Sequence, residues 1–65
     1  MHYFNSSAIY AGSYDAATSN LTIWFTSSGQ AYDYPGVPLH TWQGLLNASS
    51  AGTYFNLHIR DQYAA

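Results

Sequence analysis

A chain of 65 residues without cysteine is expected to form one domain near the lower size limit of an unaided core, with neither disulfides nor thiolate metal sites. Charged side chains make up 6% of the residues, against about 25% in typical soluble proteins. Arg60 is the only Lys or Arg, and the formal net charge is −2. One arginine is too few for the several phosphate contacts on which binding of long nucleic acid depends.

The same composition favours self-association. Aromatic residues make up 18% of the chain, and exposed tyrosine and tryptophan are common in protein interfaces. With little charge to keep copies apart, we expect a homo-oligomer, most simply a two-fold dimer. No apolar stretch reaches the roughly 18 to 20 residues that cross a bilayer, and residues 1–4 lack the basic start and apolar core of a signal peptide. We therefore expect a cytoplasmic protein with no membrane association.

Side chains alternate between two faces, as in strands, in three segments of the first half of the chain. These segments are residues 8–14, 21–26 and 31–34. In the second segment the inward set is Leu21, Ile23 and Phe25, and Trp24 faces the other way. The inner face of the first segment stays ambiguous. The three segments predict an antiparallel meander, with residues 1–7 as an arm or the entry to a strand.

The second half of the chain is predicted to begin with a short helix. Pro38 suits its first position, where the missing N–H of proline costs nothing. Trp42, Leu45 and Leu46 recur at i, i+3 and i+4, which makes the helix amphipathic. This pattern holds despite Gly44, because a glycine in a helix interior costs only about 1 kcal/mol relative to alanine.

A second short helix is predicted to follow. Ser49 or Ser50 can cap its first turn. Ala51, Phe55 and Ile59 then lie on one stripe at a spacing of four residues. This stripe is expected to pack on the sheet.

The order of these elements predicts an α+β fold, in which a three-stranded antiparallel meander is followed by two short helices packed on one face (β-β-β-α-α). The helices are needed because the apolar face of so small a sheet must be covered. We expect a single domain over residues 1–65, with residues 1–5 and 62–65 as candidates for fraying.

The sequence contains no clear motif for catalysis, a metal or a cofactor. There is no glutamate, and the aspartates are predicted in a turn, a strand and the tail: Asp15, Asp33 and Asp61. The histidines match no compact metal-ligand spacing: His2, His40 and His58. Neither a Gly-X-Ser-X-Gly elbow nor a glycine-rich phosphate loop is present. We therefore expect no enzyme, metal or cofactor, and an unrecognised hydrolase is the least favoured alternative.

Aromatic and amide side chains are the best candidates for a binding site. Tyr32 and Tyr34 point to the same face of an extended segment, just before a Pro-Gly turn. Flat rings stack on bases, amides read base edges, and an arginine can hold a phosphate. The predicted ligand-binding residues are Tyr32, Tyr34, Tyr54, Asn56 and Arg60.

Structural roles compete with these assignments. Tyrosines in so small a domain can be core residues or contacts between copies. The face of the sheet that Tyr32 and Tyr34 occupy stays open, because a slip of one residue in register would reverse it. Arg60 could pair with Asp33 or Asp61, interact with the C-terminal end of the second helix, or hold an anion. The residues predicted to lie in an interface are Trp24 and Tyr63.

One series of residues extends over nearly the whole chain with a characteristic spacing. It comprises Ser6-Ser7, Ile9, Tyr14-Asp15, Leu21, Phe25, Gly29, Tyr32-X-Tyr34, Val37-Pro38, Ala48, Ser50, Gly52, Tyr54-Phe55-Asn56, Ile59-Arg60 and Tyr63. In this series the chain resembles the KTSC domain, which is found in single-domain bacterial and phage proteins and at the C-terminus of some lysyl-tRNA synthetases.

The resemblance implies a recurrent small fold, and the synthetase fusion has suggested RNA binding for the family. Family members often look basic between the two tyrosines and along the last helix. This chain has Asp33, Thr53 and Leu57 at such positions, which disfavours binding of a polynucleotide by this member.

The leading hypothesis is a non-catalytic homo-oligomer that binds or sequesters a small nucleotide-like ligand in a shared aromatic pocket, with Arg60 on a phosphate. Such a protein needs affinity and no chemistry, which would suit a phage anti-defence protein acting on a nucleotide immune signal. The alternatives are a protein–protein interaction module and a weak RNA-binding domain, as the resemblance implies.

Overall fold

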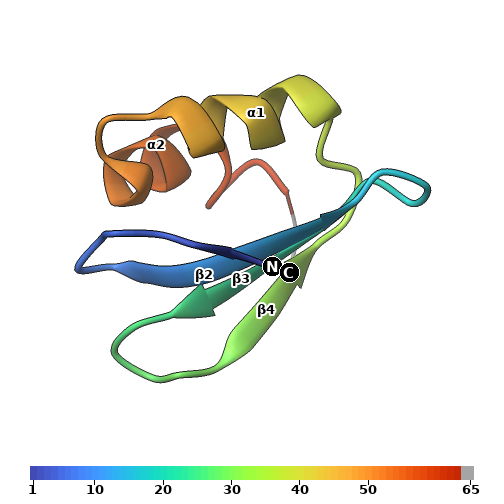
Figure 1. Ribbon diagram of the computed structural model, residues 1–65. Helices are drawn as coiled ribbons and strands as arrows, with labels where there is room; N and C mark the ends of the chain where they lie inside the picture. The colour runs from blue at the N-terminus through green and yellow to red at the C-terminus, as the bar shows by residue number, and fades with distance from the viewer. Residues whose placement is uncertain (64–65) are drawn as a thin grey trace.

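The computed structural model describes residues 1–63. Its elements are β1 (His2–Tyr3), β2 (Ile9–Asp15), β3 (Asn20–Phe25), β4 (Ala31–Tyr34), α1 (Leu39–Asn47) and α2 (Ala51–His58). The strands form one antiparallel sheet in the order β1-β2-β3-β4, and both helices lie on one face of it (Figure 1). The predicted α+β class with two helices on one face is confirmed. Residues 64–65, part of the end predicted to fray, lie outside the described residues.

The sheet has four strands, so the predicted three-stranded meander is wrong in this detail. The additional strand is β1, which pairs with β2 by placing His2 opposite Gly12. Tyr3 lies opposite Ala11. A strand of two residues is too short to show alternation in the sequence, and only its pairing with β2 makes it recognisable.

A bulge in β2 explains why the alternation left its inner face ambiguous. Between Ile9 and Ala11 the register with β3 shifts by one residue, which leaves Tyr10 as an extra residue in β2. Ile9 and Gly12 are three positions apart and would face opposite sides of a regular strand. Because of the bulge both face the helices: Ile9 is fully buried, and a Cβ at Gly12 would lie 3.2 Å from the Trp42 ring of α1.

The core lies between the sheet and the two helices. Leu21 and Ile23 of β3 are fully buried, and Phe25 packs against them from the edge of the core, so the predicted inward set is confirmed. Burial of each such side chain contributes about 1.5–3 kcal/mol. The buried cluster is Ile9, Leu21, Ile23, Tyr34, Val37, Leu45, Ala51, Phe55 and Ile59.

The connection from β4 to α1 is tied to the sheet by two hydrogen bonds. Gly36 has a φ of 77°, which a residue with a side chain rarely adopts. The next residue, Val37, is fully buried; its N–H donates to the Ser19 carbonyl at 3.0 Å. The Tyr14 hydroxyl donates to the Val37 carbonyl at 2.6 Å. These contacts fix the point at which the chain leaves the sheet.

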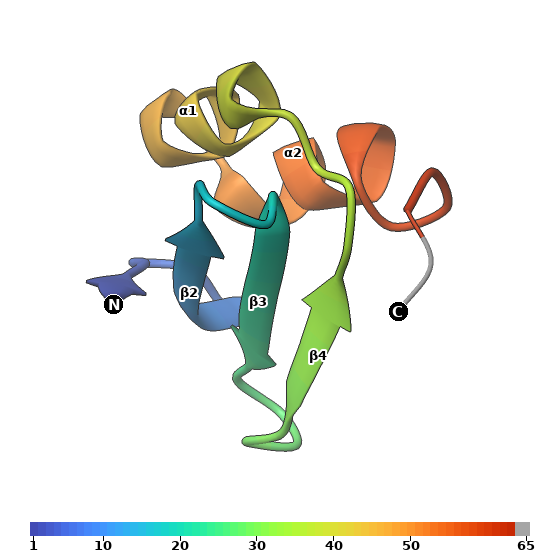
Figure 2. The ribbon, with the colours of Figure 1, turned by 90° about the vertical axis from the view of Figure 1, so that its right-hand side faces the viewer.

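Helix α1 covers the β1–β2 side of the sheet (Figure 2). The Trp42 ring stacks on the Tyr14 ring, with centroids 5.9 Å apart and planes inclined by 11°, and it meets the Phe4 ring edge-on at 6.4 Å. Leu45 is fully buried. Pro38 is the N-cap of α1, one position before the place predicted for it.

Helix α2 covers the β3–β4 side. The Ser50 hydroxyl oxygen caps it by accepting from the Thr53 N–H at 3.3 Å, which selects one of the two serines predicted for this role. The predicted stripe is confirmed, because Ala51, Phe55 and Ile59 are buried. Neither helix within residues 1–63 is long and apolar enough to cross a membrane.

The two helices approach each other closely at Gly44. A Cβ added there would meet the hydroxyl group and the ring of Tyr54. Helix propensity favours alanine over glycine by about 1 kcal/mol, so packing against Tyr54 opposes the intrinsic preference of the helix.

Gly44→Ala is expected to destabilise the protein by about 1–3 kcal/mol through overpacking. In a Tyr54→Ala background the ring is gone, and the same substitution is expected to stabilise by up to about 1 kcal/mol. Urea unfolding followed by circular dichroism gives the four free energies of this double-mutant cycle. A loss of equal size in both backgrounds would show that Tyr54 is not the reason for the glycine.

Candidate functional site

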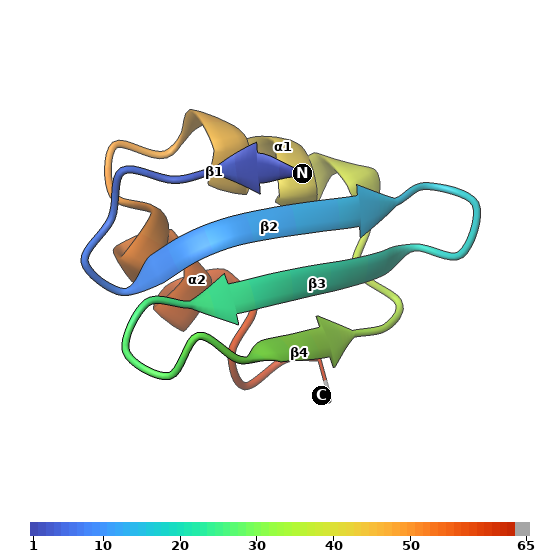
Figure 3. The same ribbon diagram turned by 60° about the horizontal axis from the view of Figure 1, so that its bottom comes forward.

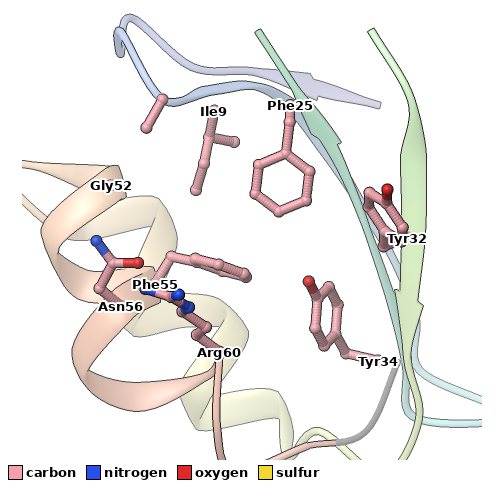
Figure 4. Close-up of a pocket in the computed structure, with 9 residues that line it drawn as sticks. Ile9, Phe25, Tyr32, Tyr34, Gly52, Phe55, Asn56 and Arg60 are labelled. Carbon is pink, nitrogen blue, oxygen red and sulfur yellow. The ribbon is translucent and has the colours of Figure 1, made fainter. Parts of the chain in front are cut away.

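A groove of about 430 Å³ opens between α2 and the β4 side of the sheet. In Figure 4 the β4 side chains lie on one wall and the α2 side chains on the other, with Ile9, Phe25 and Phe55 between them. The lining residues are Ala8, Ile9, Phe25, Tyr32, Tyr34, Gly52, Phe55, Asn56 and Arg60.

Register decides the position of the two β4 tyrosines. Tyr32 lies opposite Ile23, and Tyr34 lies opposite Leu21. Both β3 partners are fully buried, so the tyrosine pair faces the helices, which answers the question that the sequence left open. Tyr34 is only 7% exposed and is a core residue that borders the groove, whereas Tyr32 is 44% exposed and free to contact a ligand.

Packed aromatic rings form the floor of the groove. The Phe55 ring meets the Phe25 ring edge-on, with centroids 5.4 Å apart, and it meets the Tyr34 ring in the same way at 5.5 Å. Phe25 in turn meets Tyr32 edge-on at 5.6 Å. Rings held in this geometry form a preorganised apolar surface against which a flat ligand can pack.

The other wall is built on α2. Gly52 and Asn56 are one turn apart on the helix, and Arg60 follows shortly after the last helical residue. The Arg60 N–H donates to the Phe55 carbonyl at 2.9 Å, which fixes the backbone beneath the exposed guanidinium-bearing side chain. At the other end of this wall a Cβ at Gly52 would lie 3.1 Å from the Cβ of Ala8, so α2 and the segment before β2 are in close contact.

Three polar groups influence one another at the Arg60 end of the groove. Burial raises the pKa of the Tyr34 phenol, the neighbouring Tyr32 raises it further, and the positive charge of Arg60 partly opposes the rise. The Tyr34 hydroxyl is therefore protonated at neutral pH and can donate a hydrogen bond beside a guanidinium group.

The structure removes one of the partners considered for Arg60. Asp33 points to the opposite face of the sheet, where its carboxylate accepts from the Thr22 hydroxyl at 2.7 Å and from the Asn20 amide at 3.4 Å. Arg60 lies just beyond the C-terminal end of α2, where the helix dipole favours a cation.

The groove brings together four of the five predicted ligand residues and leaves out Tyr54. That ring lies over α1 and 4.4 Å from the His58 ring, in a separate hollow of about 270 Å³. The two predicted interface residues lie apart from each other. Trp24 is on the sheet face away from the helices, partly buried, and Tyr63 packs against the core.

Several groove residues were identified in the sequence only as parts of strands and helices. Phe25 and Phe55 were predicted on inward faces, and Ile9 lay in a segment whose inner face stayed ambiguous, yet all three also line the groove. They reach it because each lies where the core meets its edge. Residues 1–63 contain no group of three or more His, Cys, Asp or Glu side chains that could hold a metal ion.

The raised pKa of Tyr34 predicts a specific loss of stability in alkali. A folded-state pKa above the unfolded value of about 10 means that the native state holds the proton more tightly. This contribution is complete below the unfolded pKa and is lost as the pH rises through the folded one. Thermal unfolding of the protein and of Tyr34→Phe between pH 8 and 11.5 should show the wild type losing Tm faster than the variant above pH 10. Parallel curves would contradict the prediction.

Comparison with known proteins identifies the fold. The KTSC domain profile matches residues 5–63. The crystal structure of a KTSC domain protein from Yersinia pestis is similar to this chain, with a TM-score of 0.92 and 32% sequence identity, over 97% of this chain and 87% of that one. The comparison with curated proteins gave no match. The resemblance read from the spacing of residues is thus confirmed, and the chain belongs to the KTSC domain family.

Proposed function

We propose that this protein binds a small nucleotide-like ligand in the groove beside α2. One observation carries the proposal: the only Lys or Arg of the chain, Arg60, lines the same groove as Tyr32, close enough to Tyr34 to affect its pKa, around an apolar aromatic floor. Aromatic rings stack on bases, and a guanidinium group binds phosphate.

The size and construction of the groove support this proposal. Its volume of about 430 Å³ lies within the range of roughly 300–1,000 Å³ that ligand sites occupy. We therefore expect one ligand for each copy of the chain.

Binding without turnover is the proposed mode of action. Among residues 1–63, those that line the groove include no Asp, Glu or His, the side chains that most often act as general acid–base pairs at neutral pH. Sequestration of a ligand needs affinity alone. A phage anti-defence role against a nucleotide signal would be one use of such a protein.

Substitutions on the two walls test the proposal with adenosine and guanosine monophosphates as probes. Arg60→Ala is expected to weaken binding about tenfold or more, because it removes a charge-assisted hydrogen bond. Tyr32→Ala should weaken it about fivefold or more by loss of stacking. Tyr10→Ala, an exposed tyrosine on the other face of the sheet, is the matched control. Isothermal titration calorimetry gives the affinities, and an unchanged affinity in Arg60→Ala would place the ligand elsewhere.

The protein as purified from cells offers an independent check. Its native mass should exceed that of the polypeptide by the mass of a nucleotide per chain. Denaturation should then release this molecule for identification by mass spectrometry.

A second candidate function is association through the sheet face that the helices leave open (Figure 3). Tyr3 and Tyr10 are 63% and 53% exposed there, with their rings edge-on at 5.5 Å, and Trp24 lies on the same face. We propose that two copies pack these faces together. A standard interface covers about 800 Å² per partner. Association with a different protein would use the same rings.

Weak RNA binding is supported less well. A single arginine in a chain of net charge −2 offers few contacts for a phosphate backbone.

Tyr10→Asp tests the open sheet face. The wild type is expected to be dimeric at micromolar concentration, and the buried charge should make the variant monomeric with an unchanged circular dichroism spectrum. Leu57→Asp is the control, because Leu57 is equally apolar and 65% exposed on α2. Light scattering coupled to size-exclusion chromatography gives the masses. A monomeric wild type, or a dimer that tolerates Tyr10→Asp, would contradict this assignment.

A further inference from the structure

Resting on the binding function proposed above, we infer that the groove takes a ligand with a single negative charge, of the class of phosphodiester monoanions to which cyclic mononucleotides belong. A neutral nucleoside should bind more weakly. A nucleoside triphosphate should bind no more tightly, although it carries the same base and more charge.

Within residues 1–63, Arg60 is the only charged residue that lines the groove. Asp33 is turned to the opposite sheet face, and His58 lies with Tyr54 at the separate hollow. His2 lies against Phe4 and Trp42 over the β1–β2 side. The groove therefore offers one positive charge to a ligand.

The neutral donors beside that charge suit one compact anion. The Tyr34 hydroxyl lies within electrostatic reach of both Arg60 and Tyr32. The Tyr32 hydroxyl donates to the exposed Gln30 amide oxygen at 3.3 Å, a partner that an anion can replace. The guanidinium fork can bind the two free oxygens of a phosphodiester, and the Tyr34 hydroxyl can add a neutral donor close to it.

The rest of the groove has little to offer a second phosphate. The Asn56 amide is polar but uncharged, whereas Ile9, Phe25 and Phe55 are apolar, and a second phosphate placed against them would lose its water without a partner. Placed outside the groove, it would meet a chain of net charge −2. Residues 1–63 hold no cluster of metal-ligating side chains to neutralise it through a divalent ion.

Calorimetric titration in EDTA at low, constant ionic strength measures the discrimination. The probes are adenosine, 3′,5′-cyclic AMP and ATP, with the guanosine series as a second set. In the series with the preferred base, the cyclic nucleotide is expected to bind about tenfold or more tightly than the nucleoside, as a charge-assisted contact predicts. ATP is expected to bind no more tightly than the cyclic nucleotide, and the stoichiometry should be one ligand per chain.

Two variants link the discrimination to the groove. Arg60→Gln keeps most of the side-chain length and should reduce the difference between cyclic nucleotide and nucleoside to less than about threefold. Asp61→Asn changes the net charge by one at the neighbouring exposed position and should preserve the full difference. Circular dichroism verifies that both variants are folded.

The outcomes separate this inference from the proposed function. Adenosine binding as tightly as cyclic AMP, or ATP binding more than tenfold tighter, would overturn the single-charge inference and leave nucleotide binding in place. Loss of discrimination in Asp61→Asn as well as Arg60→Gln would also overturn it, because a general charge effect would then explain the data. Failure of every probe to bind the wild type would remove the proposed function itself and this inference with it.

Discussion

The packing of Phe55 against Phe25 and Tyr34 is the interaction on which the rest of the structure depends. It holds α2 on the β3–β4 side of the sheet, and edge-to-face ring pairs contribute about 0.5–1.5 kcal/mol beyond the area that they bury. The same rings are the floor of the groove. In a domain of 65 residues no separate layer is available for a site, so the apolar half of the candidate site is the edge of the core.

Because the core and the groove share these rings, the groove residues fall into two groups. Phe25, Phe55 and Tyr34 are fixed by packing, since replacing any of them loosens α2 as well as the site. Tyr32 and Arg60 are exposed and contribute little to the core. Substitution at these two exposed positions is therefore compatible with the fold.

Side-chain periodicity correctly predicted those strands and helices whose inward face can be recognised from their own residues. The alternation of Leu21, Ile23 and Phe25 and the four-residue spacing of Ala51, Phe55 and Ile59 are each complete within one element. The two-residue strand β1 and the bulge at Tyr10 depend on pairing with another strand, which periodicity does not encode.

The site was predictable to a similar extent, for the same reason. Asn56 and Arg60 are four residues apart, a spacing that puts two residues on one side of a helix. Both line the groove, although α2 ends at His58 and Arg60 lies beyond it. Tyr54 and Asn56 are two residues apart, about 200° around a helix, and so they lie on different sides of α2. The inward orientation of Tyr32 and Tyr34 depends on register with β3.

The close contact of Gly52 with Ala8 sets the width of the groove at this end. The distance between α2 and the sheet at this end is fixed by backbone and Cβ atoms, which have no rotamers to adjust. A larger residue at position 52 would press against Ala8 and change the width of the groove at this end, while Tyr32 and Arg60 would stay as they are.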